Sequence, residues 1–325
     1  MASGLNAYDV HEAFNLILGR PPESEVTIVD HLNAYDSREA LWAGMLATEE
    51  FRDNGLRRPD IDALLMMAVR RSMRSNGSLI DHEVSRETLA LLLERIRAQW
   101  TRLGETDPHW SVLVQREFRT NELTEVARRD FAQSGVEMAD LIALFEERTG
   151  APISRRVCLE LGCGVGRITR HLADKFDRVV AVDISPGNLT VCENYLRAEG
   201  VTNVELRLIS NPTDFGMLPD IDLFFSVIVL QHNPPPVQKF ILQAVLQKVR
   251  PGGAALFQIP TTMADYRFDV AEYLDTPHPT MEMHGLPTAI VLDTIRSAGL
   301  VVRDIAADPF IGIMGSNTFF AVRPL

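Results

Sequence analysis

Two hydrophobic periodicities divide this chain. In its first third, apolar residues recur three and four positions apart, which predicts amphipathic helices within 6–54 and at 61–74 and 84–103. From residue 157 onwards, short apolar runs alternate with helical patterns. The run at 223–230 is apolar almost throughout and suits a central parallel strand buried on both faces. This alternation predicts an α/β fold, a sheet with helices on both faces, preceded by an all-α N-terminal domain.

The expected elements after residue 105 fill one large domain. One helix is expected after residue 121 and another at 138–149. Further helices are expected at 188–199 and 237–249. The expected strands are 157–161, 179–183, 204–209, 223–230 and 254–259, with 299–302 and 317–322 as a terminal antiparallel pair. A turn-forming segment at 104–108 marks a boundary. We therefore expect a helical module at 1–55, a helical linker at 56–104 and an α/β domain at 105–325.

A glycine-rich turn follows the first expected strand. Gly162, Gly164 and Gly166 occupy alternate positions that suit neither a strand nor a helix interior. Without a Cβ atom, glycine allows unusual φ angles and lets a ligand approach the backbone closely. The next strand ends in Asp183, about 20 residues further on, where a carboxylate can accept both hydroxyls of a ribose. The segment therefore predicts a nucleoside-binding βαβ unit.

The spacing of the glycines indicates which nucleoside is bound. A dinucleotide fingerprint requires G-x-G-x-x-G, but the third glycine position of that fingerprint holds Arg167 here. Glu160, at the end of the strand, would repel a pyrophosphate but attract the cationic amino-acid part of S-adenosylmethionine. The pattern therefore disfavours a nicotinamide dehydrogenase.

These residues carry a resemblance to a known family. Residues 159–167 resemble the first motif of the class I S-adenosylmethionine-dependent methyltransferases, and residues 182–185 resemble the second. The resemblance implies a Rossmann-like sheet, S-adenosylmethionine as cofactor and S-adenosylhomocysteine as product. It places the following residues at the cofactor: Glu160, Gly162, Cys163, Gly164, Gly166, Arg167, Asp183 and Ile184.

Further cofactor contacts are expected at three places in the chain. For the contact to adenine, the family usually has an acid shortly after a strand. Either Asn211 or Asp214, which follow the expected strand 204–209, is a candidate for this position. Ser226 is expected opposite the methionine end. In the resembled family a helical flap before the first strand closes over the cofactor, which makes Phe131 and Ser134 candidates for the pocket wall.

Two histidines are candidate catalytic bases. His232 follows the central strand, and an unperturbed imidazole pKa near 6.5 suits proton removal from a hydroxyl nucleophile. The alternative is a histidine that only caps the neighbouring proline-rich loop. His284, beside Glu282, lies in a late insertion where the family carries substrate-binding elements. We expect no metal site, because no clear set of carboxylates accompanies the motifs.

The N-terminal helices carry a second resemblance. Residues 17–22 and 46–51 resemble a small helical domain, distantly similar to phycobilisome linkers, that is attached to bacterial surface-glycan enzymes. This resemblance implies a module that docks glycan-assembly enzymes or presents a sugar or glycan acceptor. An equally good interpretation is a helical cap that only stabilises the catalytic domain.

Composition narrows the class of protein. The net charge of −12 argues against a dedicated nucleic-acid binder, and the arginines between 57 and 74 are interpreted as a solvated helix face. Three cysteines without C-x-x-C spacing suit a reducing cytoplasm. We expect neither a leader nor a transmembrane segment, since the longest apolar runs are too short to span a bilayer.

Together these features predict a cytoplasmic methyltransferase acting on oxygen of a sugar, a glycan or another small molecule. The alternatives are methylation of nitrogen or carbon of another metabolite, and a non-catalytic cofactor-binding regulator or scaffold.

Overall fold

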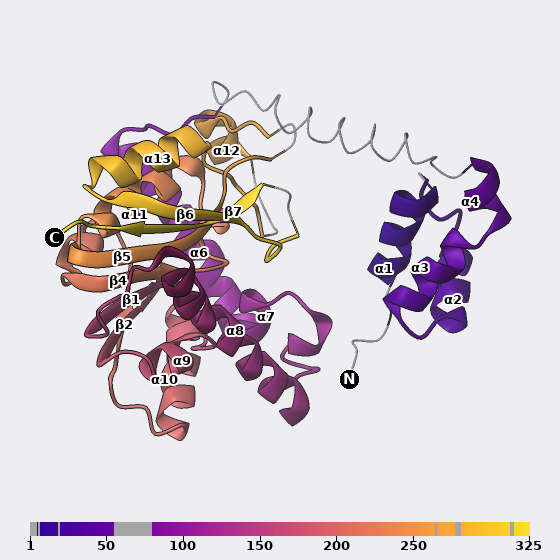
Figure 1. The fold of residues 1–325 in the computed structure, drawn as a ribbon, viewed down its shortest axis with the longest axis horizontal. Helices are drawn as coiled ribbons and strands as arrows, with labels where there is room; N and C mark the ends of the chain where they lie inside the picture. The colour runs from indigo at the N-terminus through magenta and orange to yellow at the C-terminus, as the bar shows by residue number, and fades with distance from the viewer. Residues whose placement is uncertain are drawn as a thin grey trace. The chain divides into compact units, whose positions relative to one another are not determined.

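The computed structural model describes residues 5, 7–18, 20–54, 80–263, 266–276, 281–312 and 315–325. The chain divides into two compact units, Met1–Arg71 and Ser72–Leu325, shown in Figure 1. The expected helix at 61–74 and the arginine cluster within 57–74 lie outside the described residues.

The first unit is a compact helical module, as predicted. Its elements are α1 (Ala7–Ala13), a π-helical turn η1 (Phe14–Leu18), α2 (Glu25–Ala34), α3 (Arg38–Leu46) and α4 (Glu49–Asn54). Serine side chains cap two of these helices: the Ser24 hydroxyl accepts from the Thr27 N–H, and that of Ser37 from the Ala40 N–H. Their apolar faces form a small core of Val10, Ala13, Phe14, Ile17, Leu41 and Met45. The likeness to a linker-type domain stays a prediction.

The second unit contains a seven-stranded sheet with the order β3-β2-β1-β4-β5-β7-β6. Its strands are β1 (Val157–Leu161), β2 (Arg178–Asp183), β3 (Val204–Leu208), β4 (Ile221–Ser226), β5 (Val249–Pro260), β6 (Val301–Ala307) and β7 (Ser316–Val322). The first five are parallel, whereas β7 runs antiparallel to both β5 and β6. The predicted terminal antiparallel pair is thus confirmed. The direction of strand order reverses between β1 and β4, where open α/β sheets bind their ligands.

Helices cover both faces of this sheet. The helices α8 (Glu125–Thr149), α9 (Thr169–Ala173) and α10 (Pro186–Ala198) pack on one face, together with Cys158 of β1. The other face holds α6 (Arg86–Thr106), α11 (Pro235–Leu246) and α13 (Thr288–Ser297), which share one hydrophobic core with Leu159 and Leu161 of β1. The shorter elements are α7 (Pro108–Val112), η3 (Arg116–Phe118), η4 (Pro212–Met217), η5 (Leu230–His232) and α12 (Val270–Asp275). The α/β fold with helices on both faces is therefore confirmed.

The helix α6 lies against the sheet rather than between two domains. The expected boundary between residues 104 and 105 falls inside it, and its Leu92 and Leu93 are buried in the same core as Leu159. At its C-terminal end, a Cβ atom on Gly104 would lie 2.1 Å from the Ser185 hydroxyl at the start of α10. This close contact attaches α6 to the α/β unit, so the segment expected as a linker contributes to that unit's core.

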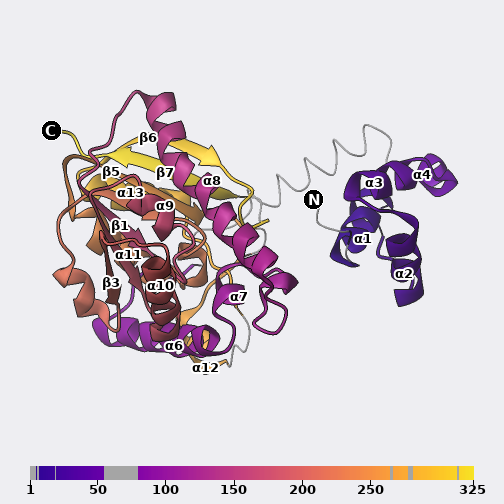
Figure 2. The ribbon, with the colours of Figure 1, turned by 90° about the horizontal axis from the view of Figure 1, so that it is seen from below.

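The helix α8 is a single helix of 25 residues, seen as one of the longest elements in Figure 2. We expected a helix to begin only at residue 138, after the Ser134-Gly135 pair. The structure shows another use for this glycine: a Cβ atom there would lie 2.0 Å from the carbonyl oxygen of Arg167. Gly135 therefore permits close contact between α8 and the segment after the glycine turn, without breaking the helix.

The strand β4 is shorter than expected. The apolar run at 223–230 suggested one continuous strand, but β4 ends at Ser226. Ile228, two residues later, has φ of +61°, which no strand can include. The residues after Ser226 therefore turn away from the sheet. Among the described residues, no helix combines the length and the apolarity needed to cross a membrane.

Candidate active site

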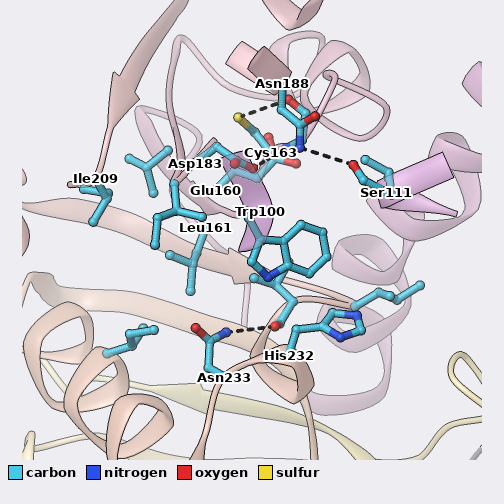
Figure 3. A pocket seen from close by; sticks show the side chains of 18 of the residues that line it. Trp100, Ser111, Glu160, Leu161, Cys163, Asp183, Asn188, Ile209, His232 and Asn233 are labelled. Carbon is cyan, nitrogen blue, oxygen red and sulfur yellow. Dashed lines mark hydrogen bonds between the residues drawn. The ribbon is translucent and has the colours of Figure 1, made fainter. Parts of the chain in front are cut away.

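A cavity lies beyond the carboxyl ends of β1, β2 and β4, at the place where the strand order reverses (Figure 3). The glycine turn and the ends of these strands form its floor, and α6 and α7 contribute the opposite wall. Seven of the predicted cofactor residues line it: Glu160, Gly162, Cys163, Gly164, Arg167, Asp183 and Ile184. Of the two candidate bases, His232 lines the cavity.

The glycine turn leaves its backbone open to a ligand. The N–H groups of Gly162 and Cys163 both donate to the carbonyl of Val182, at 2.8 and 3.1 Å, which fixes the turn to the end of β2. Gly162 and Gly164 have φ of +73° and +54°. Added Cβ atoms would lie 2.4 Å from Val229 and 2.6 Å from Val112, respectively. Glycine is thus required at both positions by backbone conformation and by space.

Asp183 supports the glycine turn from β2. Its Oδ2 accepts from the Gly164 N–H and its Oδ1 from the Ser185 N–H, both at 2.8 Å. Burial raises the pKa of this carboxyl group, and the backbone N–H donors oppose that rise. Each carboxylate oxygen can accept a second hydrogen bond. Asp183 can therefore hold the turn and still accept the hydroxyl groups of a ribose in the cavity.

Glu160 and Arg167 are buried charged groups with unused hydrogen-bonding capacity. Burial raises the pKa of Glu160 to about 7, although the charge of Arg167 opposes the rise. Burial lowers the pKa of Arg167 to about 10. Within the described residues, Glu160 Oε2 and Arg167 Nε have no hydrogen-bond partner. An unpaired buried polar atom is unfavourable, and this acceptor and donor in one cavity match the ammonium and carboxylate groups of an amino acid.

His232 has a defined tautomer at the cavity wall. Its Nδ1 lies 2.9 Å from the carbonyl oxygen of Glu282, so Nδ1 carries the proton and Nε2 is the basic nitrogen. The side-chain amide of Gln231 donates to Nε2 at 3.3 Å. Burial lowers the pKa of His232, with the bond to Glu282 opposing the change. The ring lies 5.2 Å from that of Trp100, beside it in Figure 3.

The two candidates for the adenine contact serve another purpose in the structure. Asn211 and Asp214 form a capping box at the start of η4, where Asp214 Oδ2 accepts from the N–H groups of Ser210 and Asn211 at 2.7 and 3.0 Å. Neither residue lines the cavity. The wall on this side is apolar and includes Ile209 and Phe215.

Four further predicted cofactor residues also lie outside the cavity lining: Gly166, Ser226, Phe131 and Ser134. Gly166 faces α10, where an added Cβ atom would lie 2.9 Å from the sulfur of Cys192. The Ser226 hydroxyl donates to a β1 carbonyl, and the ring of Phe131 packs against that of Phe118 in η3. Ser134 has an indirect role, because its carbonyl and hydroxyl oxygens accept from Arg167 Nη1 at 3.1 and 3.2 Å.

His284 is not among the residues that line the cavity. It is 5% exposed, its Nδ1 lies 2.9 Å from the hydroxyl oxygen of Tyr266, and its backbone N–H donates to the carbonyl of Gln231 at 2.7 Å. Gln238 also donates to the carbonyl of His284, at 3.2 Å. These contacts attach the loop around His284 to the segment that carries His232.

Sequence reasoning missed the wall contributed by α6 and α7. Leu93, Ile96 and Trp100 of α6 line the cavity, as do Ser111 of α7 and Asn188 of α10. The Asn188 amide donates to the Ser111 hydroxyl at 3.4 Å, as Figure 3 shows. The helical spacing of the α6 residues predicted a buried face, but periodicity does not indicate what that face covers.

The family assignment follows from comparison with known proteins. Residues 158–253 match the family model described as "Methyltransferase domain". This part of the chain is therefore similar to methyltransferase domains, and the match includes the two motifs identified in the sequence. S-adenosylmethionine is therefore the cofactor of this domain, as expected from the motifs.

Two curated relatives match the methyltransferase part of the chain. The "Ubiquinone biosynthesis O-methyltransferase" of Pseudomonas fluorescens is 29% identical over 167 residues, which cover 49% of this chain and 70% of that protein. The "Probable cobalt-precorrin-6B C(15)-methyltransferase (decarboxylating)" of Methanothermobacter thermautotrophicus is 29% identical over 124 residues, covering 38% and 61%, respectively. The relatives thus include proteins named for transfer to oxygen and to carbon.

Two solved structures are similar to this chain at 16% identity. A methyltransferase from Clostridium acetobutylicum has a TM-score of 0.46 and covers 62% of this chain and 96% of its own. Magnesium protoporphyrin IX methyltransferase from Synechocystis, with bound S-adenosylhomocysteine, has a TM-score of 0.49 and covers 70% and 98%.

Proposed function

We propose that this methyltransferase transfers a methyl group from S-adenosylmethionine to a hydroxyl oxygen of a small-molecule acceptor, with His232 as general base. The observation that carries the proposal is the position of His232: its Nδ1 is held by the carbonyl of Glu282, and its ring forms part of the wall of the cavity that contains the glycine turn.

The cavity has separate regions for the parts of the cofactor. Asp183 is suited to the ribose hydroxyls. Glu160 Oε2 and Arg167 Nε, which have no partner among the described residues, are suited to the ammonium and carboxylate groups. The apolar side chains of Ile184, Ile209 and Phe215 offer a surface for the adenine. In this arrangement van der Waals contact replaces the side-chain hydrogen bond that we expected from Asn211 or Asp214.

The bound cofactor supplies a methyl group on a positively charged sulfur. Transfer requires in-line approach of the acceptor, and fixed orientation in a closed site supplies much of the rate. Because burial lowers its pKa, His232 is neutral near neutral pH and can accept the hydroxyl proton at Nε2. An acceptor hydroxyl at this nitrogen would replace the weak contact from Gln231.

Two features support an oxygen acceptor, and one favours a second candidate. The relative from Pseudomonas fluorescens is named an O-methyltransferase, and a neutral histidine base suits a hydroxyl. The archaeal relative, named for transfer to carbon, favours C-methylation as the second candidate. A sugar or glycan acceptor, and docking of glycan-assembly enzymes by the N-terminal helices, rest on residues 17–22 and 46–51 alone.

Calorimetric titration with S-adenosylmethionine, S-adenosylhomocysteine and NAD tests the cofactor site first. We expect micromolar binding of the two sulfur compounds and none of NAD. Incubation with phenols, sugars, nucleotide sugars and tetrapyrroles, followed by mass spectrometry of the products, then identifies the acceptor atom. If neither sulfur compound binds, the chain is not a working methyltransferase. A methyl group found on carbon would replace the O-methylation proposal by the second candidate.

A further inference from the structure

Ile228 has a backbone conformation that is unfavourable for its residue type. Among the described residues it is the one non-glycine residue with positive φ, at +61°. In this region the Cβ atom of an L-residue approaches the backbone too closely, and a β-branched side chain makes the conflict worse. Such a conformation persists only where neighbouring groups impose it, and it is frequent at functional sites.

A buried side chain on the adjacent strand holds this conformation. Gln258 of β5 is fully buried, and its Oε1 accepts from the Ile228 N–H at 2.9 Å. Its Nε2 donates to the Ser316 hydroxyl at 2.6 Å, and that hydroxyl donates to Asp308 Oδ1 at 2.8 Å. Each group donates to the next and the chain ends at a carboxylate, so every bond polarises the one before it. Thr318 secures the end of the chain by donating to Asp308 Oδ2 at 3.0 Å.

The conformation of Ile228 determines where the next residues lie. Val229 fills the space above Gly162 that a Cβ atom would otherwise occupy. The carbonyl of Val229 accepts from the His232 N–H at 3.1 Å and from the Asn233 side chain at 3.0 Å. A strand continuing through Ile228 would carry this carbonyl away from both residues. The cofactor site and the candidate base therefore depend on the same strained turn.

We propose that Gln258 is a positioning residue: it holds Ile228 in the left-handed conformation and thereby places Val229 and His232 at the cofactor cavity. Gln258 itself does not line the cavity and touches no reacting atom. This inference rests on the proposed function, because it assigns Gln258 to the site where we propose that the cofactor and acceptor bind.

The first test compares two variants of the same buried chain. Gln258→Met keeps the length of the side chain but removes both hydrogen bonds, and we expect it to weaken S-adenosylhomocysteine binding by about tenfold, as for loss of one buried hydrogen bond. Thr318→Val removes a bond to Asp308 but leaves the bond to Ile228 intact, so its affinity should stay within about twofold of the original chain. Both variants should lower the Tm. Equal affinity in Gln258→Met and the original chain would overturn the proposal.

Replacing Ile228 separates positioning from general packing. Glycine adopts positive φ freely, so Ile228→Gly should no longer need Gln258 to hold the turn. In that background, Gln258→Met should weaken S-adenosylhomocysteine binding by less than about threefold. A tenfold loss in both backgrounds would show that Gln258 does not act through Ile228.

Hydrogen exchange of the cofactor-free protein keeps this test independent of the proposed function. Amide protons of residues 227–232 should exchange faster in Gln258→Met and at the original rate in Thr318→Val, because only the former frees the Ile228 N–H. Unchanged exchange in Gln258→Met overturns the inference whatever the ligand does. Failure of the original chain to bind S-adenosylhomocysteine instead contradicts the proposed function.

Discussion

Asp183 and Gly164 are joined by a hydrogen bond of 2.8 Å from the backbone N–H of Gly164 to Oδ2 of Asp183. The residue expected to bind the ribose therefore also fixes the glycine turn. We therefore expect cofactor affinity and local stability to be linked through this one carboxylate.

Asp183→Ala should weaken both properties. Loss of its hydrogen bonds should cost about 1.5 to 3 kcal/mol of S-adenosylmethionine binding, measured by calorimetry, and about 1 to 3 kcal/mol of unfolding free energy, because buried N–H groups lose their acceptor. Asp183→Asn is the control, since its amide oxygen can still accept from one of the two N–H groups. Unchanged affinity in Asp183→Ala would contradict the ribose assignment.

We expect the Glu160 carboxylate to stabilise the bound cofactor but to lower the unfolding free energy of the cofactor-free protein. Its folded pKa, about 7, lies above the ordinary value of 4.5. Between these values the folded chain holds a proton that the unfolded chain has lost, so stability falls as pH rises from 4.5 to 7. Glu160→Gln should therefore raise the unfolding free energy at pH 8 by about 1 to 3 kcal/mol and leave it nearly unchanged near pH 4.5. Urea unfolding at the two pH values measures this difference.

Binding should show the opposite dependence on pH. Loss of the Glu160 proton creates the charge that attracts an ammonium group, so S-adenosylmethionine affinity should rise from about pH 6 to about pH 8. In Glu160→Gln the affinity should be lower and this rise should be absent. Equal pH profiles in the two proteins would exclude Glu160 as the ammonium partner.

His232→Gln should separate chemistry from binding. We expect a loss in rate of about 10² to 10⁴, as for removal of a general base, with S-adenosylhomocysteine affinity retained. In the original chain the rate should fall as pH drops through the lowered pKa of His232, because the protonated ring cannot act as a base. Rates are measured as S-adenosylhomocysteine formation with the acceptor identified by screening. His284→Gln is the comparison, and a loss of pH dependence in that variant alone would assign the base to His284.

Asp214→Ala tests whether the capping box touches the cofactor. Loss of the cap should cost about 1 kcal/mol of unfolding free energy. Because Asp214 does not line the cavity, S-adenosylmethionine affinity should stay within about twofold of the original. Thermal unfolding and calorimetry measure the two quantities. A tenfold loss of affinity would instead support the predicted contact between Asp214 and the adenine.

The second unit should fold and bind its cofactor without the first. Every residue that lines the cavity belongs to Ser72–Leu325, so a chain of residues 72–325 should bind S-adenosylmethionine within about twofold of the full-length protein. Calorimetry of the two chains side by side measures this. A shorter chain starting at residue 105 should fail to fold, because it lacks most of α6 and the leucines that this helix buries in the core.

Local signals in the sequence predicted residues that the structure places together on the floor of the cavity. Gly162, Gly164 and Asp183 lie in one short βαβ unit, where chain connectivity alone brings the turn and the next strand end together. Other predicted cofactor residues lie further from the glycine turn in the sequence, and among those that do not line the cavity are Asn211, Asp214, Phe131 and Ser134. Asn211 and Asp214 carry the polar groups expected for an adenine contact, but hydrogen bonds to their own neighbours turn those groups to the start of η4. Phe131 and Ser134 lie in the interior of α8, where packing with the glycine segment sets their direction.

The sequence by itself determined the α/β alternation, the glycine turn and the acids at two strand ends, because these depend on periodicity and on residues close together in the chain. Only the tertiary structure decided that α6 forms a wall of the cavity, that β4 ends at Ser226 and that Gln258 holds Ile228. Each of these depends on which elements meet across the sheet. A hydrogen bond between Gln258 and Ile228 links residues 30 positions apart, and no local pattern of hydrophobic and polar positions records such a contact.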